Sequence, residues 1–455
     1  MNIILLLIIA IIMVLCVRKY IWWNNWAGNV SKIGVMVIKP HTIRDIEREK
    51  GTGKGLDIYI GSAHSWNEEI YGGDGATLID TRGFNKVLGM QGGAGGTMWV
   101  TVEGGILLKD LYEYLRKNDL GLRGIPYTRD VTLAGAISTG THGTGEKMLS
   151  ESVVSIKILG YPRAIGRGHE AFPSVLLGLG RCGFIQEITI ECTKGIRILK
   201  RHIQVEEGSG SGALYIDFLK KDHGMLFWNP DTGKEILHST STVRGTHEPA
   251  MHTVEKDDYV KNIFASISGP LIYAVPRMKK VVAQMMIQGL IEEKIGDEYA
   301  VLSEKEKDFR YVESEVAVVW DKGREAYKDI KENIMREKVL YNNVLLLVCR
   351  KVFPDSALLS PSRRMRNEDT APTHSDDKVK EDISVPYIYI SMIVYGPWGT
   401  WKETLGWFVQ RMVRKYGGKP HWGKYTGMSL ERQMSLYPKD IVEEYKKMCK
   451  VVSYM

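Results

Sequence analysis

The sequence predicts an α+β protein of two or three domains that is preceded by a hydrophobic helix. The chain has 455 residues, which is longer than a single hydrophobic core usually serves. Strand-like and helix-like apolar patterns both occur along it, without an internal repeat. One uninterrupted apolar run, residues 3–17, stands at the N-terminus. Because 44% of the residues are hydrophobic and 25% are charged, the composition excludes a disordered, collagenous or polytopic membrane protein.

The charge and the cysteines disfavour several functions. The formal net charge of +7 is modest for this length and no basic run is long, so no nucleic acid is expected as a partner. The five cysteines are far apart and mostly within apolar runs, which predicts buried thiols instead of disulfides or a zinc site. The chain lacks H-E-x-x-H and G-x-S-x-G motifs, so neither a metal site nor hydrolytic chemistry is predicted.

The apolar run at residues 3–17 is predicted to be an uncleaved membrane anchor. At 1.5 Å per residue it would span roughly 24 Å, slightly less than a hydrocarbon core of about 30 Å. Arg18, Lys19, Trp22 and Trp23 follow it, and such residues suit the headgroup layer on the cytoplasmic side. No cleavage site is visible after the run, although a signal sequence with an unusual end is the alternative. Residues 1–21 are therefore expected to hold the protein to the endoplasmic reticulum or another intracellular membrane.

Past this run, strands and helices alternate in the first half of the chain. Residues 57–61 are predicted to be a strand that ends in a glycine turn, and residues 99–103 alternate at the strand period. Residues 106–116 place several apolar side chains on one helical face, namely Leu107, Leu108, Leu111, Tyr112 and Leu115. Residues 156–159 and 185–191 are predicted to be two further strands.

The pattern is mixed from about residue 200 onward. A strand at 317–320 leads into a helical stretch, and the apolar run 344–350 is typical of a buried strand. The polar residues 362–382 are predicted to form a solvated loop. Residues 387–395 indicate another strand, and residues 401–416 an amphipathic helix.

Two glycine-rich loops point most directly to a function. Residues 133–145 (LAGAISTGTHGTG) combine small residues with hydroxyls, so that many N–H and O–H groups can approach a pyrophosphate without side-chain bulk. Residues 61–66 (GSAHSW) offer a second loop of this kind, although each loop alone could equally be a tight turn. The candidate cofactor-binding residues are Gly61, Ser62, Ala63, His64, Ser65, Gly135, Ser138, Thr139, Gly140, Thr141, His142, Gly143 and Ile185.

Seven motifs follow one another along the chain: WNNWAG, GSAHSW, VTVEGGILLKDL, DVTLAGAISTGTHGTG, LGLGRCGFIQEITI, DSALLSP and GGKPHWGK. Taken in this order, they resemble the sugar-lactone oxidase branch of the vanillyl-alcohol-oxidase-type FAD-linked flavoproteins. That branch contains the L-gulonolactone and D-arabinono-1,4-lactone oxidases. The resemblance extends from residue 23 to about residue 445, and GILLKDL and GGKPHWGK are most similar to the gulonolactone oxidases.

The resemblance implies the architecture and the cofactor. An FAD-binding domain of the vanillyl-alcohol-oxidase type over 22–197 would precede an α+β substrate cap domain over 198–410, and residues 411–455 would return to the first domain. FAD is the implied cofactor. His64 matches the histidine to which such enzymes attach the flavin covalently, and the alternative for His64 is a hydrogen-bonded loop histidine.

The resemblance also implies a reaction, the oxidation of a gulono- or arabinono-type sugar-1,4-lactone by hydride transfer to flavin N5. Oxygen would be the acceptor, giving hydrogen peroxide, unless another acceptor replaces it. Arg350, Lys424 and His421 match the family's catalytic positions, and a cation there would stabilise charge on the flavin and the substrate. The alternatives are a structural ion pair for Arg350 and a surface lysine for Lys424.

Three departures from the family pattern leave a second interpretation open. Val348 stands two residues before Arg350, where the family usually has glutamate, and Ala63 stands where it usually has glycine. The chain also stops at Met455, soon after the HWGK motif, where gulonolactone oxidases usually continue. The alternative function is therefore a flavin-binding paralogue with weakened catalysis, or one that acts on a different alcohol or polyol.

Overall fold

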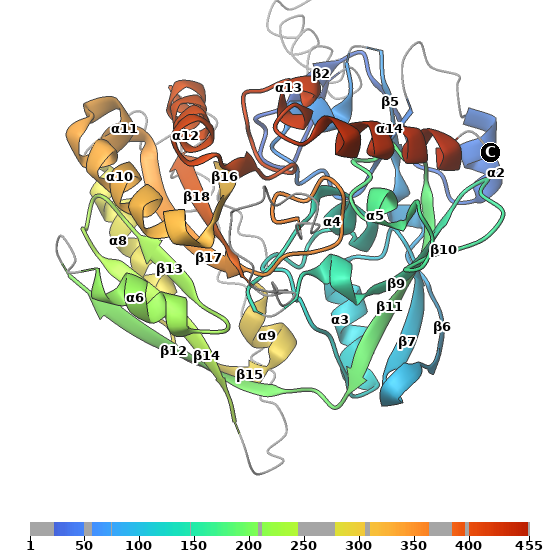
Figure 1. Cartoon of the computed structure of the whole chain (residues 1–455), viewed down its shortest axis with the longest axis horizontal. Coiled ribbons are helices and arrows are strands. Elements are labelled where there is room, and N and C mark those ends of the chain that lie inside the picture. The colour runs from blue at the N-terminus through green and yellow to red at the C-terminus, as the bar shows by residue number, and fades with distance from the viewer. Residues whose placement is uncertain are drawn as a thin grey trace, which may run out of the picture.

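The computed structural model describes residues 22–49, 57–73, 75–145, 147–207, 212–243, 278–304, 310–363, 385–395 and 400–453. These residues form an α+β fold with one two-stranded, one three-stranded, one six-stranded and one eight-stranded sheet. The first three sheets come from residues 22–194, coloured from blue to green in Figure 1, and the eight-stranded sheet comes from residues 198–420. We call these two parts the first half and the second half of the chain.

The first half contains a small parallel sheet and a larger antiparallel sheet. The parallel sheet has the order β3-β5-β4, and the antiparallel sheet has the order β10-β9-β11-β7-β6, with β8 paired to β11. The strands are β1 (Trp22–Asn24), β2 (Ser31–Ile33), β3 (Met36–Ile38), β4 (Asp57–Ile60), β5 (Thr77–Asp80), β6 (Val87–Gly92), β7 (Met98–Glu103), β8 (Leu120–Gly121), β9 (Val153–Ile158), β10 (Ile165–Gly166) and β11 (Ile185–Lys194). The helices are α2 (Ile43–Glu49), α3 (Leu108–Lys117), α4 (Leu133–Thr139) and α5 (Phe172–Val175).

The core of this half forms where the amphipathic patterns predict it. Val100 and Val102 of β7 are buried, whereas the residues between and beside them are partly exposed. Helix α3 packs into the same hydrophobic cluster through its predicted apolar face, with Leu108, Leu111, Tyr112 and Leu115 buried. Burial of one face of each element explains why both patterns were visible in the sequence.

The second half is built on an antiparallel sheet with the strand order β15-β12-β14-β13-β17-β18-β16-β19. Helices α6, α10 and α12 pack on one face of this sheet, and α8 packs on the other. The strands are β12 (Ile198–Glu206), β13 (Met225–Trp228), β14 (Glu235–Thr242), β15 (Lys294–Asp297), β16 (Tyr311–Val319), β17 (Val344–Val352), β18 (Tyr387–Tyr395) and β19 (Lys419–Pro420). The helices are α6 (Ala213–Lys220), α8 (Met278–Leu290), α9 (Glu298–Leu302), α10 (Gly323–Arg336), α11 (Lys338–Asn343) and α12 (Trp401–Tyr416).

The last helices return to the first half of the chain. Helices α13 (Leu430–Met434) and α14 (Lys439–Ser453), red in Figure 1, lie over the blue and teal half. Ile441, Tyr445 and Val452 join the hydrophobic cluster of the first half. The Tyr445 hydroxyl also donates a hydrogen bond to the Gly178 carbonyl at 3.0 Å. The end of the chain therefore contributes to the core of its beginning.

One prediction about the cysteines is wrong. Cys182 and Cys449 form a disulfide that joins the first half to helix α14, with their Cα atoms 4.3 Å apart. Cys192 and Cys349 are buried and free, as the apolar runs predict. The pairing could not be read from the sequence because 267 residues separate the two cysteines.

This disulfide is expected to stabilise the fold by about 2 to 4 kcal/mol, because it restricts a long loop in the unfolded chain. A reductant should therefore lower the denaturation temperature of the wild-type protein. The reductant should not change the denaturation temperature of the double variant Cys182→Ala/Cys449→Ala. That variant should unfold at the temperature of the reduced wild type. If the reductant shifts both proteins equally, the disulfide does not contribute this stability.

The other predicted elements are present, with differences at some ends. The strand at 387–395 and the helix at 401–416 have the predicted bounds, whereas the strand predicted at 317–320 is the end of the longer β16. Ser362 and Arg363, at the start of the predicted solvated loop, are buried. The rest of that loop up to 382, and the predicted anchor over 1–21, lie outside the described residues. None of the helices within the described residues has the length and apolar character needed to cross a membrane.

Candidate active site

A cavity of about 260 Å³ lies between the two glycine-rich segments of the first half and one face of the eight-stranded sheet. We call this the inner face of the sheet, since it carries Phe227, Val348 and Arg350 toward the cavity. The cavity volume is close to the lower end of small-molecule pockets. Both halves of the chain are needed to enclose it.

His64 lies in the loop that follows β4 and lines this cavity. Its ring stacks on Trp26, with the ring centroids 5.1 Å apart. Both ring nitrogens are buried and have no hydrogen-bond partner within the described part of the chain. Burial lowers the pKa of His64 to about 4, so the imidazole is neutral at neutral pH. A neutral imidazole with an unpartnered nitrogen keeps a lone pair available for bond formation.

The same loop depends on its small residues. A Cβ at Gly61 would lie 2.0 Å from Thr132 Oγ1, so only glycine lets this loop touch the start of α4. Ala63 adopts a φ of 55°, in the left-handed region that costs a residue with a Cβ about 1 to 2 kcal/mol. The departure from the family's glycine at Ala63 therefore carries a conformational cost.

Residues 133–139 form the short helix α4 instead of a loop. Thr132 caps its start, where Oγ1 accepts a hydrogen bond from the Gly135 N–H at 3.2 Å, and Gly140 ends it with a left-handed φ of 70°. The predicted cofactor-binding residues that line the cavity are Gly61, Ser62, Ala63, His64, Ser65, Gly135, Ser138, Thr139, Thr141, His142 and Ile185. Gly140 and Gly143 are not among the lining residues. A Cβ at Gly143 would lie 1.9 Å from the Ile125 carbonyl oxygen, so its small size serves close packing.

Arg350 and Lys424 face two carboxylates on β16. Arg350 Nη1 donates to Glu315 Oε1 at 2.6 Å and lies 3.8 Å from Glu313 Oε1. Lys424 Nζ donates to Glu313 Oε2 at 2.6 Å and lies 4.3 Å from the centroid of the Trp66 ring. Burial alone would raise the pKa of Glu315. The pKa nevertheless lies well below its usual value, because His142, Arg350 and Lys424 stabilise the charged carboxylate. The four charged side chains form a buried array on the cavity wall.

The carboxylate that is missing at Val348 is supplied by another strand. Strand pairing puts Val348, Ser391 and Glu315 in one row across β17, β18 and β16. Ser391 Oγ lies between the two charged groups, since it donates to Glu315 Oε1 at 2.9 Å and accepts from Arg350 Nη1 at 3.0 Å. The carboxylate–arginine pair that the family usually builds within one strand is therefore built here between strands.

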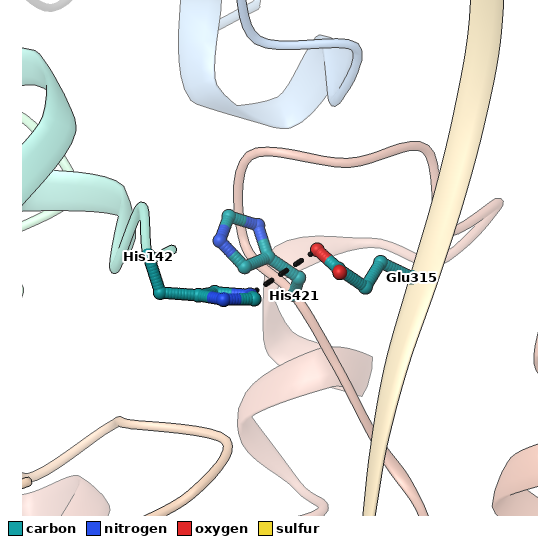
Figure 2. A group of neighbouring side chains, drawn as sticks. All are labelled: His142, Glu315 and His421. Atoms are coloured by element: carbon teal, nitrogen blue, oxygen red, sulfur yellow. Dashed lines mark ion pairs between the residues drawn. The ribbon is translucent and has the colours of Figure 1, made fainter. Parts of the chain in front are cut away.

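His142, Glu315 and His421 form a buried cluster beside this array (Figure 2). His142 Nε2 lies 3.4 Å from Glu315 Oε2, and all three residues are of types that bind metals. However, His421 Nδ1 accepts from the Gly423 N–H and Nε2 donates to the Gly140 carbonyl, each at 3.0 Å. Burial lowers the pKa of His421 to about 3, so its ring is neutral. The cluster thus fastens the HWGK segment to the end of α4, and His421 offers no free ligand atom.

Two polar atoms of the array are buried without a hydrogen-bond partner among the described residues, Arg350 Nε and Glu313 Oε1. The first can only donate a hydrogen bond, and the second, on an ionised carboxylate, can only accept one. Leaving such atoms unpaired costs free energy. Both residues line the cavity, and a hydroxyl group both accepts and donates, so a ligand hydroxyl that reached the two atoms would satisfy them.

Asp355, in the DSALLSP motif, is buried where the second half meets the first. Its Oδ2 accepts a hydrogen bond from Ser150 Oγ at 2.7 Å, and burial raises the pKa of Asp355 from 3.8 to about 6. Because the folded protein binds this proton more tightly than the unfolded chain, the stabilisation is present below about pH 4 and is lost as the pH rises to about 6.

Asp355→Asn is therefore expected to be more stable than the wild type above about pH 6, by about 2 to 3 kcal/mol, because the amide is never charged. The advantage should shrink as the pH falls toward about 4. Urea unfolding of both proteins across this range measures the difference. A difference in unfolding free energy that does not change with pH would contradict the shifted pKa.

Glu313, Glu315 and Ser391 were not predicted from the sequence as site residues. The segment ESEVAVV carries two glutamates two residues apart in an otherwise apolar strand. The strand period places both carboxylates on one face, and buried glutamates are almost always paired. That spacing was the available indication of buried cations opposite β16.

Two protein families match this chain, one on each side of the cavity. An FAD-binding domain family matches residues 52–160, which include both glycine-rich segments, and the D-arabinono-1,4-lactone oxidase family matches residues 213–451, which include the charged array. The protein is therefore an FAD-linked oxidoreductase. It belongs to the D-arabinono-1,4-lactone oxidase family, in the sugar-lactone oxidase branch of the vanillyl-alcohol-oxidase-type flavoproteins.

Relatives and solved structures extend this likeness over most of the chain. An L-gulono-1,4-lactone dehydrogenase of Mycobacterium tuberculosis is 25% identical over 433 residues, covering 91% of this chain and 92% of the relative. A D-arabinono-1,4-lactone oxidase of Candida albicans is 22% identical over 487 residues, covering 92% and 86%. The crystal structure of cholesterol oxidase from B. sterolicum matches with a TM-score of 0.71 and 14% identity, covering 94% of this chain and 93% of that chain. The predicted mixed helix-and-sheet fold of the vanillyl-alcohol-oxidase type is thus confirmed.

Proposed function

We propose that the protein oxidises a hydroxyl-bearing carbon of a gulono- or arabinono-type sugar-1,4-lactone, with oxygen as the final acceptor and hydrogen peroxide as the second product. The observation that carries this proposal is that Arg350 and Glu313 line the cavity and that each has a buried polar atom, Nε and Oε1, without a hydrogen-bond partner among the described residues. The names of the two relatives, an L-gulono-1,4-lactone dehydrogenase and a D-arabinono-1,4-lactone oxidase, support the substrate class.

FAD fits the opposite wall of the cavity. The segments around Gly61 and Gly135 bring small residues and hydroxyls to one place, and His64 presents an unpartnered imidazole there. We assign the FAD-binding domain to 22–197, the substrate cap to 198–410 and the returning segment to 411–455, with the flavin attached covalently to His64. When bound, FAD supplies the hydride acceptor at N5 for this reaction.

Arg350 and Glu313 are the proposed catalytic residues. Arg350 Nε donates to the substrate oxygen and stabilises negative charge as that oxygen loses its proton. Glu313 Oε1 accepts the hydroxyl proton, as a general base within hydrogen-bond reach. The proton and the hydride leave the same carbinol group, which becomes a carbonyl.

The neighbouring residues act by positioning this pair. Glu315 and Ser391 hold the Arg350 guanidinium through Nη1, which leaves Nε without a bond to either of them. Lys424 holds the other oxygen of Glu313. His421, which the family pattern placed among the catalytic residues, is assigned a positioning role because both of its ring nitrogens bind backbone groups.

The alternative of a paralogue with weakened catalysis rested largely on Val348. The geometry argues against that interpretation, because Glu315 pairs with Arg350 at 2.6 Å without a carboxylate at position 348. If neither lactones nor polyols reduce the bound flavin, the protein is instead such a paralogue with weakened catalysis.

The proposal is tested by mixing the FAD-loaded protein anaerobically with L-gulono-1,4-lactone or D-arabinono-1,4-lactone. The visible absorption of oxidised flavin should be lost, and admitting oxygen should restore it with release of peroxide. Glu313→Gln should slow the loss by about two to four powers of ten, the scale of general-base catalysis.

Glu235→Gln is the matched control for this variant. Glu235 is also a buried, ion-paired carboxylate of the sheet, but it binds Lys331 and Tyr327 and does not line the cavity. It should leave the rate of flavin reduction unchanged. If both variants lose activity alike, damage to the fold explains the loss and Glu313 is not the base.

A further inference from the structure

Much of the cavity wall on the substrate side is apolar. Beside the charged array and Tyr311, the inner face of the sheet and the end of α8 contribute six hydrocarbon side chains, namely Phe227, Leu290, Leu345, Leu346, Val348 and Ile393. All six belong to one hydrophobic cluster, in which Ile393 is partly buried and the others are buried. We call these residues the apolar wall.

Strand register places the apolar wall directly beside the catalytic pair. Phe227 lies opposite Val348, and Leu346 lies opposite Ile393, which is itself opposite Glu313. Leu346 and Val348 precede Arg350 at the strand period and lie on the same face of β17. A ligand whose hydroxyl reaches Arg350 and Glu313 therefore has the apolar wall next to its remaining atoms.

This placement selects against a ligand that carries hydroxyls along its whole length. Hydroxyls held against Val348, Leu346 and Phe227 would lose water without gaining a partner from these side chains. A glutamate at position 348 would offer such a partner, but the carboxylate in this chain lies at Glu315, where Arg350 occupies it. The wall gains most from a ligand with an alkyl portion.

We propose that this site also binds and oxidises alcohols with an alkyl chain, and that the apolar wall holds that chain. The inference rests on the proposed function for its redox chemistry. In the step, the carbinol C–H bond breaks and its hydride goes to the bound FAD, which is reduced. The O–H bond breaks and its proton goes to Glu313. A primary alkanol thereby becomes an aldehyde, so atoms and electrons balance.

Binding is tested apart from turnover with 2-methylalkan-2-ols of increasing chain length. These tertiary alcohols keep the hydroxyl but have no hydrogen on the carbinol carbon, so they bind without reacting. Their dissociation constants for the FAD-loaded protein, read from the change in the visible flavin spectrum, should fall about fourfold for each added methylene.

Val348→Thr keeps the side-chain shape and adds one hydroxyl to the wall. It should weaken binding of the longest tertiary alcohol about fivefold or more. Val394→Thr is the control, because Val394 lies on β18 in the cluster on the outer face of the same sheet. It should leave the affinity and its dependence on chain length unchanged.

Oxidation is then measured with primary alkanols in anaerobic mixing, where the rate of flavin reduction should rise with chain length until the wall is filled. Affinities that do not change with chain length, or that Val348→Thr and Val394→Thr alter equally, would overturn the inference while lactone oxidation stands. Length-dependent binding combined with a flavin that neither alkanols nor lactones reduce would overturn the proposed function and, with it, this activity.

Discussion

Replacing Arg350 by methionine is expected to slow anaerobic flavin reduction by about two to three powers of ten. Methionine keeps an unbranched side chain but removes Nε, a buried donor without a hydrogen-bond partner among the described residues, together with the positive charge on the cavity wall. Lys424→Met should slow flavin reduction by a similar factor, since it leaves Glu313 Oε2 without its ammonium partner. The measurement is the rate at which flavin absorption is lost after rapid mixing with L-gulono-1,4-lactone.

Arg350→Met should also cost stability, by about 3 to 5 kcal/mol, because it removes the cation that is hydrogen-bonded to the buried Glu315 carboxylate. The double variant Arg350→Met/Glu315→Gln removes both charges of this pair. It should therefore regain much of the lost stability, measured by urea unfolding, and none of the lost rate. If the double variant regains the rate as well, Arg350 acts only through folding and its catalytic role is wrong.

His64→Ala is expected to abolish retention of flavin by the denatured protein. The wild type should keep its yellow colour after acid precipitation and fluoresce on a denaturing gel, because a covalent bond survives unfolding. The physical basis is the neutral His64 imidazole, whose ring nitrogens are buried without a partner in the described part of the chain.

His421→Ala is the control for this prediction. It removes a buried, neutral histidine that also lines the cavity and leaves His64 in place. It should therefore retain the denaturation-resistant flavin. A colourless wild-type pellet with FAD in the supernatant would refute covalent attachment and leave non-covalent FAD binding intact.

The sequence predicted best those elements whose pattern is strong and local. The bounds of β18 and α12 were predictable because a continuous apolar run and an amphipathic run each end sharply, the latter at Gly417 with its left-handed φ of 64°. Helix α4 was missed as a helix because its few residues include Gly135 and the hydroxyl residues Ser138 and Thr139, which favour loops. Its cap at Thr132 and the packing around it decide the conformation.

The candidate site was predictable only where a motif carries it. His64, Arg350 and Lys424 could be located from local motifs, and the structure brings all three to one cavity. The partners of Arg350 could not be located in this way, because Glu315 reaches it from 35 residues earlier in the chain and across a strand that comes later. Such a contact is fixed by sheet order, which local periodicity does not determine.

Catalysis by Arg350 and Glu313 is tested by anaerobic reduction of the bound flavin with L-gulono-1,4-lactone, in which the wild type is compared with Glu313→Gln and Arg350→Met at matched flavin content. The wild type should lose its oxidised-flavin absorption, and each variant should be slower by at least about two powers of ten. Wild-type flavin that the lactone does not reduce, or reduction at equal rates in all three proteins, would contradict the assignment of the hydroxyl to Arg350 and Glu313.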